Sequence, residues 1–359
     1  MTKIELAHPL RVLIVDDSAY NRRNIADILA SCPDVELVGK AGDGEEALRM
    51  ATGLHPDVIT LDLEMPKMDG FTFLRILMSR QPTPVIVVSS YSQKENVFKA
   101  LELGAIDFVA KPDRQVGPDM PELREQILSK VLMVRNLRPT ATTPRPLRPS
   151  VPVRPSPNGE LGAVRMPSTP RHIIAIASST GGPTALIDVF AKMPPKSTSS
   201  ILVAQHMPDK FTRTFAERLD RKGHMSVFEA QDMDMVTAGT GMVCPGRQCL
   251  ELEPLPATAE YRVHVCAPGP GDRYVPSANR LLRSAAKALG SRAIGVILTG
   301  MGDDGVEGAR AIRDVGGSVI AESQETAVVY GMPGAAVRAG LASQTLPLGQ
   351  IAEYLAGLG

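Results

Sequence analysis

The sequence has few cysteines, no net charge and no long apolar run, and each absence excludes a class of protein. Its four cysteines form no Cys-x-x-Cys pair and are too few for a disulfide framework, so we expect reduced thiols. Lysine plus arginine and aspartate plus glutamate both number 39, so no global charge attracts nucleic acid. No apolar run approaches the roughly 18 residues that span a bilayer. The start of the chain also lacks the charged-then-apolar pattern of a signal peptide. We therefore predict a cytoplasmic protein that neither inserts into a membrane nor binds nucleic acid.

One segment divides the chain, which at 359 residues exceeds what a single core usually supports. Between Asn136 and Pro170 there are nine prolines and five arginines against one glutamate, so this stretch cannot bury enough apolar surface to fold. Its arginines would also suit docking to an acidic partner, but a solvated spacer is the favoured interpretation. We predict a first domain over residues 1–137, a flexible linker over 138–170 and a second domain over 171–359.

The first domain alternates strand and helix in the manner of a doubly wound parallel sheet. The predicted strands cover residues 11–15, 35–39, 58–61, 85–88 and 107–110, with helical patterns between and after them. In such folds, chemistry gathers at the carboxyl ends of the strands. Polar residues stand at those ends, which predicts a functional site there.

The polar residues of this edge have the chemistry of a phosphoryl acceptor. Asp16 and Asp17 follow the first strand and Asp62 the third, and three converging carboxylates favour a bound cation such as Mg²⁺. Asp62 is then placed as the nucleophile that accepts a phosphoryl group, with the metal neutralising charge on the transferred oxygens. Lys111 would pair with the product and Ser89 would hydrogen-bond to it. An ordinary strand-end ion pair would explain any one of these residues, but explains the whole set poorly.

Residues 11–137 resemble a response-regulator receiver domain. The matching motifs are Asp16-Asp17-Ser18, Leu61-Asp62-Leu63-Glu64-Met65-Pro66, Met68-Asp69-Gly70, Ser89-Ser90 and Lys111-Pro112. The resemblance implies a flavodoxin-like fold, a histidine kinase as phosphodonor and Asp62 as the phospho-acceptor. It also implies that Asp16 and Asp17 hold Mg²⁺ together with the backbone carbonyl of Glu64. Ser89 and Phe108 would form the switch pair, although Phe108 would also serve as an ordinary core residue.

The second domain repeats the alternation, so we predict a Rossmann-like parallel sheet, again doubly wound. Apolar runs at 173–177, 201–204, 263–266, 293–298 and 318–321 predict strands, and helical patterns cover 183–192, 211–221, 277–289 and 306–314. The first of these strands ends in hydroxyls and glycines, with Pro183 opening a helix. Ala177-x-Ser179-x-Gly181 differs from the nucleophile elbow of hydrolases only by alanine for the first glycine. A tight turn, or a turn that binds phosphate, is the alternative explanation.

A serine nucleophile needs a base, and a carboxylate that orients the base. Of the six histidines, only His206 lies just beyond a strong apolar strand. Asp304 follows another strand, so Ser179, His206 and Asp304 are expected at one edge of the sheet. Ser178 and Asp303 are the neighbouring residues of the same types.

Residues 171–359 resemble the catalytic domain of chemotaxis protein-glutamate methylesterases. The matching segments are Ser179-Thr180-Gly181-Gly182-Pro183, Gln205-His206-Met207-Pro208 and Leu298-Thr299-Gly300-Met301-Gly302-Asp303-Asp304-Gly305. The resemblance implies that Ser179 is the nucleophile, His206 the base and Asp304 its orienting carboxylate, with Thr180 and the turn at Met301 supplying oxyanion donors. It implies hydrolysis of methyl esters on glutamates of methyl-accepting chemoreceptors, and deamidation of receptor glutamines, with no cofactor for the hydrolase. Phosphorylation of the receiver would activate it, for sensory adaptation.

A different class of function also fits a receiver joined to a second domain. In this alternative, the second domain is a phosphorylation-controlled binding or scaffold module of a receptor array, without catalysis. Loss of Ser179, His206 or Asp304 would favour it, and all three residues are present.

Overall fold

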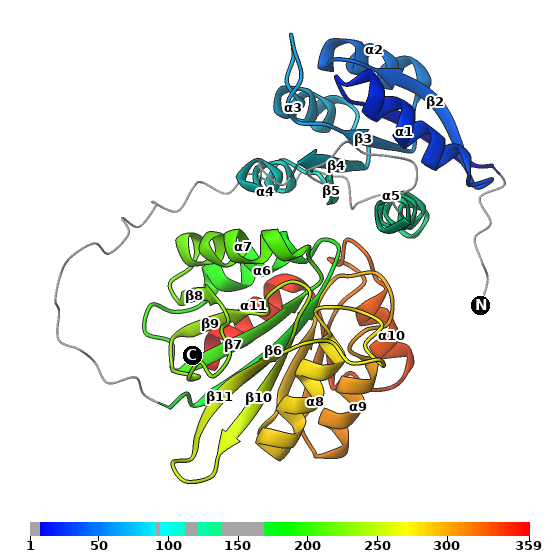
Figure 1. Cartoon of the computed structure of the whole chain (residues 1–359). Helices are drawn as coiled ribbons and strands as arrows, with labels where there is room; N and C mark the ends of the chain where they lie inside the picture. The colour runs from blue at the N-terminus through cyan, green and yellow to red at the C-terminus, as the bar shows by residue number, and fades with distance from the viewer. Residues whose placement is uncertain (1–7, 91–93, 112–120, 138–168) are drawn as a thin grey trace, which may run out of the picture. The chain divides into compact units, whose positions relative to one another are not determined.

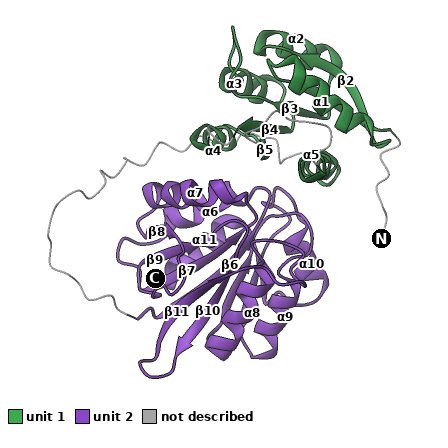
Figure 2. Cartoon of the chain, viewed as in Figure 1, with its two compact units in different colours: residues 1–147 green, residues 148–359 purple. Residues whose placement is uncertain are grey.

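The computed structural model describes residues 8–90, 94–111, 121–137 and 169–359. It divides the chain into two compact units, residues 1–147 and 148–359 (Figure 2). Nearly all of the predicted linker, 138–170, lies outside the described residues, as does Pro112. Each unit has its own sheet and is described by itself.

The first unit contains one five-stranded parallel sheet in the order β2-β1-β3-β4-β5 (Figure 1). Its strands are β1 (Leu10–Val15), β2 (Val35–Ala41), β3 (Val58–Leu61), β4 (Val85–Ser90) and β5 (Asp107–Lys111). Its helices are α1 (Ala19–Ala30), α2 (Gly44–Leu54), α3 (Gly70–Arg80), α4 (Lys94–Glu102) and α5 (Pro121–Met133), the last extended by a 3-10 turn over Val134–Asn136. This strand order is that of the flavodoxin-like doubly wound fold, as predicted.

Side-chain caps begin three of these helices beside the carboxyl edge of the sheet. Ser18, Asp43 and Asp69 each accept a hydrogen bond from the backbone N–H three residues later. Such caps satisfy one of the free N–H groups of the first helical turn. The first strand itself is almost wholly buried, as expected for a parallel sheet covered on both faces.

The second unit is built on a seven-stranded parallel sheet in the order β14-β13-β12-β6-β7-β9-β8. Its strands are β6 (His172–Ser178), β7 (Ser199–Gln205), β8 (Ser226–Glu229), β9 (Thr240–Val243), β12 (Ile294–Ile297), β13 (Ser318–Glu322) and β14 (Gln344–Leu346). Its helices are α6 (Gly182–Lys192), α7 (Asp209–Lys222), α8 (Ala278–Leu289), α9 (Val306–Asp314), α10 (Met332–Arg338) and α11 (Leu348–Gly357), and a 3-10 turn covers Gly290–Arg292. Helices α6, α7 and α11 lie on one side of the sheet and α8, α9 and α10 on the other (Figure 1). The predicted doubly wound parallel sheet is confirmed.

Residues 263–266 differ from the predicted alternation. They form the end of β11 (Glu260–Cys266), which pairs antiparallel with β10 (Cys249–Leu255) in a separate two-stranded sheet. The apolar pattern of this run resembles that of a sheet strand because one face of the hairpin packs on the core beside α8. Three strands of the main sheet, β8, β9 and β14, have only three or four residues and were not predicted. Each of these three strands begins with a polar residue and contains only one or two large apolar residues, too few to be recognised as an apolar run.

Helix α8 connects the core of the second unit to the edge where the strands end. Its buried side chains belong to the main hydrophobic cluster, and Leu281 and Leu282 are completely buried. Its first turn is capped by Ser277, whose hydroxyl accepts the N–H of Arg280. The packing of the apolar face therefore fixes where the N-terminus of this helix lies. No helix among the described residues is both long and apolar enough to cross a membrane.

Candidate active site

Three neighbouring strands of the second unit end beside the residues that the sequence singled out. Strand β6 lies between β12 and β7 in the sheet. Ser179 directly follows β6, His206 directly follows β7, and Asp304 lies in the loop between β12 and α9. The N–H of His206 donates to the carbonyl of Ser178 at 3.0 Å, so the first residues beyond β6 and β7 lie side by side.

The turn that follows β6 requires two glycines. Gly181 has φ of 78°, in the left-handed region that side chains disfavour. A Cβ on Gly182 would collide with Oε1 of Gln205 and would lie 2.8 Å from Cβ of Ser178. The N–H of Gly182 donates to the carbonyl of Ser179 at 2.8 Å, and α6 begins there. The chain thus makes the tight strand-to-helix turn that presents a nucleophile in serine hydrolases.

The two adjacent serines have different surroundings. Ser178 is completely buried, and its hydroxyl donates to Oε1 of Gln205 at 2.7 Å. Ser179 is only partly buried, at the start of the turn. The hydroxyl of Ser178 is therefore already used inside the protein, whereas Ser179 is partly open to solvent.

Gln205 is a supporting residue that the sequence reasoning missed. It is almost completely buried, and its Nε2 donates to the carbonyls of both Ser179 and His206 at 2.9 Å. One amide side chain therefore ties together the two turns that carry the candidate nucleophile and base. The signal available in the sequence was an amide at the end of an otherwise apolar strand, where buried polar groups need partners.

His206 and Asp304 are in direct contact. Nε2 of His206 lies 2.8 Å from Oδ2 of Asp304, whose side chain is 1 % exposed against 15 % for the histidine. The same carboxylate oxygen accepts the N–H of Ala278, so it acts as an acceptor and Nε2 carries the proton. The imidazole is thereby held in the tautomer that leaves Nδ1 free to accept a proton.

Asp304 is itself held by the N-terminus of α8. Its Oδ2 accepts the N–H of Ala278 at 2.8 Å and its Oδ1 accepts the N–H of Asn279 at 3.0 Å. Oδ1 of Asn279 in turn accepts the N–H groups of Gly305 and Gly308. Free N–H groups and the positive end of the helix dipole stabilise a buried negative charge. This arrangement fixes the orientation of the carboxylate.

Asp303 occupies a different environment from Asp304. Its side chain is exposed, and Oδ1 accepts a hydrogen bond from the hydroxyl of Tyr274 at 3.3 Å. Of the two neighbouring aspartates, the structure brings only Asp304 into hydrogen-bond contact with His206.

Thr180 and Met301, the expected oxyanion donors, lie on turns that a single residue joins. The carbonyl of Thr299 accepts the N–H of Ser179 at 3.0 Å, and the hydroxyl of Thr299 donates to the carbonyl of Thr180 at 2.9 Å. The N–H of Met301 has no acceptor among the described residues. Hydrogen bonds from Thr299 therefore hold the turn at Met301 beside the turn at Ser179, and the N–H of Met301 is available to a ligand.

The first unit places three carboxylates together at the carboxyl edge of its sheet. Asp16, Asp17 and Asp62 each offer an oxygen, and these oxygens lie within 4.8 Å of one another. Asp16 and Asp62 are buried and Asp17 is exposed. No other group of three such side chains occurs among the residues that the structure describes. Carboxylates that are partly open to solvent fit Mg²⁺, which retains water and binds phosphoryl oxygens.

Lys111 supplies the positive charge of this cluster. Its ammonium group donates to Oδ2 of Asp16 at 2.7 Å and to Oδ2 of Asp62. Burial raises the pKa of Asp62, and the charge of Asp16 adds to this effect while Lys111 opposes it. Burial alone would lower the pKa of Lys111. The negative charges of Asp62 and Asp16 outweigh this effect, so the pKa of the lysine is raised above its usual value. The lysine therefore stays charged and faces the carboxylate that would receive a phosphoryl group.

Ser89, Phe108 and Glu64, the other residues expected at this site, have different surroundings. Ser89 is completely buried at the end of β4, where it pairs with Ala110 of β5. Phe108 is buried, with its ring edge-on to Phe98 of α4 at 6.4 Å between centroids. The side chain of Glu64 is exposed, as suits a residue expected to act through its backbone carbonyl.

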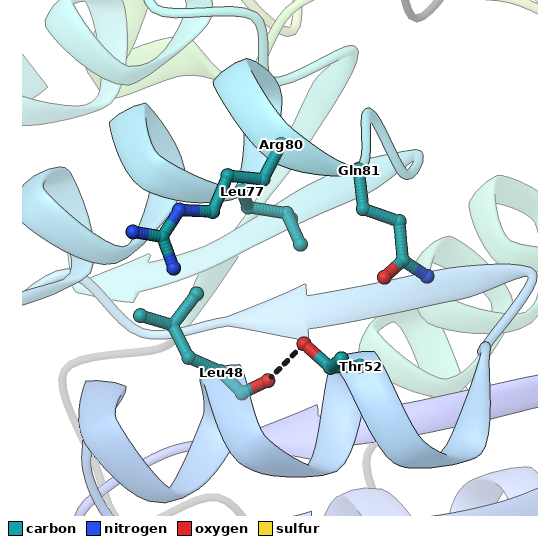
Figure 3. A pocket seen from close by; sticks show the side chains of 5 residues that line it. All are labelled: Leu48, Thr52, Leu77, Arg80 and Gln81. Atoms are coloured by element: carbon teal, nitrogen blue, oxygen red, sulfur yellow. Dashed lines mark hydrogen bonds between the residues drawn. The ribbon is translucent and has the colours of Figure 1, made fainter.

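A small cavity of about 230 Å³ in the first unit does not belong to either site. It lies between α2 and α3, and Figure 3 shows its lining side chains, Leu48, Thr52, Leu77, Arg80 and Gln81. The hydroxyl of Thr52 donates to the carbonyl of Leu48, so it is already used within the helix. We assign no ligand to this cavity.

Two family models match separate parts of the chain. The model of the CheB methylesterase family matches residues 174–355, and that of the response regulator receiver domain matches residues 12–117. A protein-glutamate methylesterase/protein-glutamine glutaminase of Myxococcus xanthus is 46% identical over 97% of both chains, and one of Geobacter sulfurreducens is 45% identical over 96% of both. The crystal structure of the CheB methylesterase catalytic domain of Thermotoga maritima is 37% identical and covers 52% of this chain and 98% of its own, with a TM-score of 0.50.

Proposed function

This chain belongs to the CheB methylesterase family, and we propose that Ser179, His206 and Asp304 are its catalytic triad. The chain is a hydrolase that removes methyl esters from glutamate side chains of chemoreceptors under the control of a phosphorylated receiver domain. The names of its relatives add the deamidation of glutamine side chains. The observation that carries the triad is the 2.8 Å contact between His206 and Asp304, at strand ends adjacent to Ser179. The alternative of a scaffold without catalysis is not favoured.

Acylation follows from the roles of these groups. Nδ1 of His206 takes the proton of Ser179 as Oγ attacks the ester carbonyl, and Asp304 stabilises the imidazolium that forms. The N–H groups of Thr180 and Met301 are the proposed donors to the oxyanion. The C–O bond to the methoxy group then breaks, and the leaving oxygen takes the proton from His206 as methanol departs.

Deacylation reverses these roles with water. His206 takes a proton from water, whose oxygen attacks the acyl-serine carbonyl, and then returns the proton to Oγ of Ser179. The products are a glutamate carboxylate, a proton and the free enzyme. A receptor glutamine follows the same path with ammonia as the leaving group.

The receiver unit is the control element. We propose that Asp62 accepts the phosphoryl group of a histidine kinase, while Asp16, Asp17 and the Glu64 carbonyl hold Mg²⁺, which would neutralise the phosphoryl oxygens. Lys111 and Ser89 would bind the product, and Phe108 would respond to Ser89. We also propose the boundaries 1–137, 138–170 and 171–359 for receiver, linker and catalytic domain. All four cysteines are free, which supports a cytoplasmic location.

Mass spectrometry tests the activity directly. Methylated receptor is incubated with the intact protein, and methyl loss is followed together with methanol release. A catalytic role predicts stoichiometric methanol, whereas a scaffold would bind the receptor and leave its methylation unchanged.

A small phosphodonor with Mg²⁺ is expected to raise the demethylation rate of the intact chain, and Asp62→Asn should remove this response. An aspartyl phosphate adds negative charge beside Lys111 and rearranges the surrounding surface. A linker keeps receiver and catalytic domain at high effective concentration, so a weak restraint suffices to hold activity low. The measurement is the initial rate of methanol release with and without phosphodonor.

The matched control is the fragment 171–359, which should be active without phosphodonor. A fragment no more active than the unphosphorylated intact chain would contradict restraint by the receiver. The receiver would then be an activator or a targeting module.

A further inference from the structure

Tyr274 lies against the candidate base without belonging to the triad. It is in the loop between β11 and α8, and its ring is nearly parallel to that of His206, with 5.3 Å between centroids and 7° between planes. This distance lies within the range of stacked aromatic pairs. The tyrosine therefore covers one face of the imidazole while Asp304 holds its Nε2.

The hydroxyl end of Tyr274 is anchored on the loop that carries Asp304. It donates to Oδ1 of Asp303 at 3.3 Å. A Cβ at Gly302 would lie 2.7 Å from this hydroxyl, so the glycine leaves the space that the tyrosine occupies. Burial raises the pKa of Tyr274, and the negative charge of Asp303 raises it further, so the hydroxyl keeps the proton that it donates.

The segment that carries Tyr274 also holds the carboxylate of the triad. Four and five residues after the tyrosine, the N–H groups of Ala278 and Asn279 donate to Asp304. One short stretch therefore contacts both the base and its orienting carboxylate. Movement of this stretch would disturb the two groups together.

We propose that Tyr274, anchored by Asp303, is a positioning residue that holds the ring of His206 and stabilises its imidazolium during acyl transfer. This inference rests on the proposed function. An aromatic face attracts a cation, and the imidazolium exists only while the proton of Ser179 resides on His206. Two further charged groups contact this pair of rings: Asp304 at Nε2 of His206, and the guanidinium of Arg273, which lies 5.2 Å from the centroid of the Tyr274 ring. The stacking contact therefore strengthens in the transition state, which affects kcat rather than KM.

Tyr274→Leu is expected to lower kcat for methanol release about tenfold, because a stacking and cation–π contact of this kind stabilises the transition state by about that factor. KM should change little, and the thermal unfolding midpoint should stay close to that of the parent protein. Tyr274→Phe retains the ring and should restore kcat to within about threefold of the parent, the remainder reflecting the lost hydrogen bond. A leucine variant with unchanged kcat, or a loss that phenylalanine does not restore, would overturn the proposal.

The anchor is tested with a second pair of variants. Asp303→Ala removes the acceptor and should lower kcat by about the same factor as Tyr274→Phe. The double variant, with both Asp303→Ala and Tyr274→Phe, should lose no more kcat than either single variant. Asp303→Asn keeps an acceptor oxygen and serves as the matched control. Additive losses would show that the two side chains act separately and would contradict the anchored pair.

The parent protein and Ser179→Ala are assayed in parallel, so that the two proposals can fail separately. If the parent releases no methanol, the proposed function fails. If the parent is active and the Tyr274 and Asp303 variants give the contradicting results, only this inference fails.

Discussion

Ser179→Ala is expected to abolish methanol release from methylated chemoreceptor, with a loss in kcat on the order of 10⁶, as for the nucleophile of other serine hydrolases. The variant removes only the hydroxyl that attacks the ester. The turn depends on backbone hydrogen bonds of residue 179 and on the glycines that follow, and the substitution alters none of these. The measurement is single-turnover methanol release with excess enzyme, together with mass spectrometry of the receptor.

Ser178→Ala is the control for this variant, because it removes a hydroxyl from the adjacent residue. That hydroxyl donates to buried Gln205, so its loss leaves an acceptor unsatisfied and should cost about 1–3 kcal/mol of stability. Activity should remain within about tenfold of the parent, because the fold retains Gln205 and its bonds to both turns. A dead Ser178→Ala beside an active Ser179→Ala would reverse the assignment of the nucleophile.

Asp304→Asn is expected to lower kcat by about 10⁴, as amide replacement does in other triads. An asparagine cannot hold His206 with its proton on Nε2 if its NH₂ group faces that nitrogen. The imidazolium would also lose the negative charge that stabilises it. The measurement is steady-state methanol release at a pH where the parent is fully active.

Asp303→Asn is the matched control and should lower kcat only slightly, and by less than Asp303→Ala does, because it keeps an acceptor oxygen for Tyr274 and leaves the charge of the triad in place. Stability separates a chemical from a structural effect at Asp304. The carboxylate accepts two backbone N–H groups of α8, and an amide has a single acceptor oxygen, so Asp304→Asn should also lose about 1–3 kcal/mol of unfolding free energy. Equal activity losses in the two variants would mean that the loop, and not one carboxylate, controls the reaction.

The sequence by itself determined the elements that are encoded locally. Alternating apolar strands and amphipathic helices predicted both parallel sheets, because burial on two faces leaves a continuous apolar run that polar or glycine residues end. The candidate site residues could be recognised for the same reason, because Ser179, His206 and Asp62 each follow the end of such an apolar run. The two sheets have similar patterns of apolar runs, and the order of the motifs that follow their strands distinguished the two units.

The tertiary structure alone decided which neighbours complete the sites. Gln205, the N–H groups at the start of α8 and the ring of Tyr274 act on residues that are distant in sequence; His206 and Asp304 are 98 positions apart. The separate hairpin β10-β11 and the short strands β8, β9 and β14 were likewise not predicted. Residues 263–266 have the pattern of a main-sheet strand, and each of the three short strands contains only one or two large apolar residues. Contacts of this kind depend on strand order and helix packing. These are set by the summed burial of the whole core and not by any single segment of the chain.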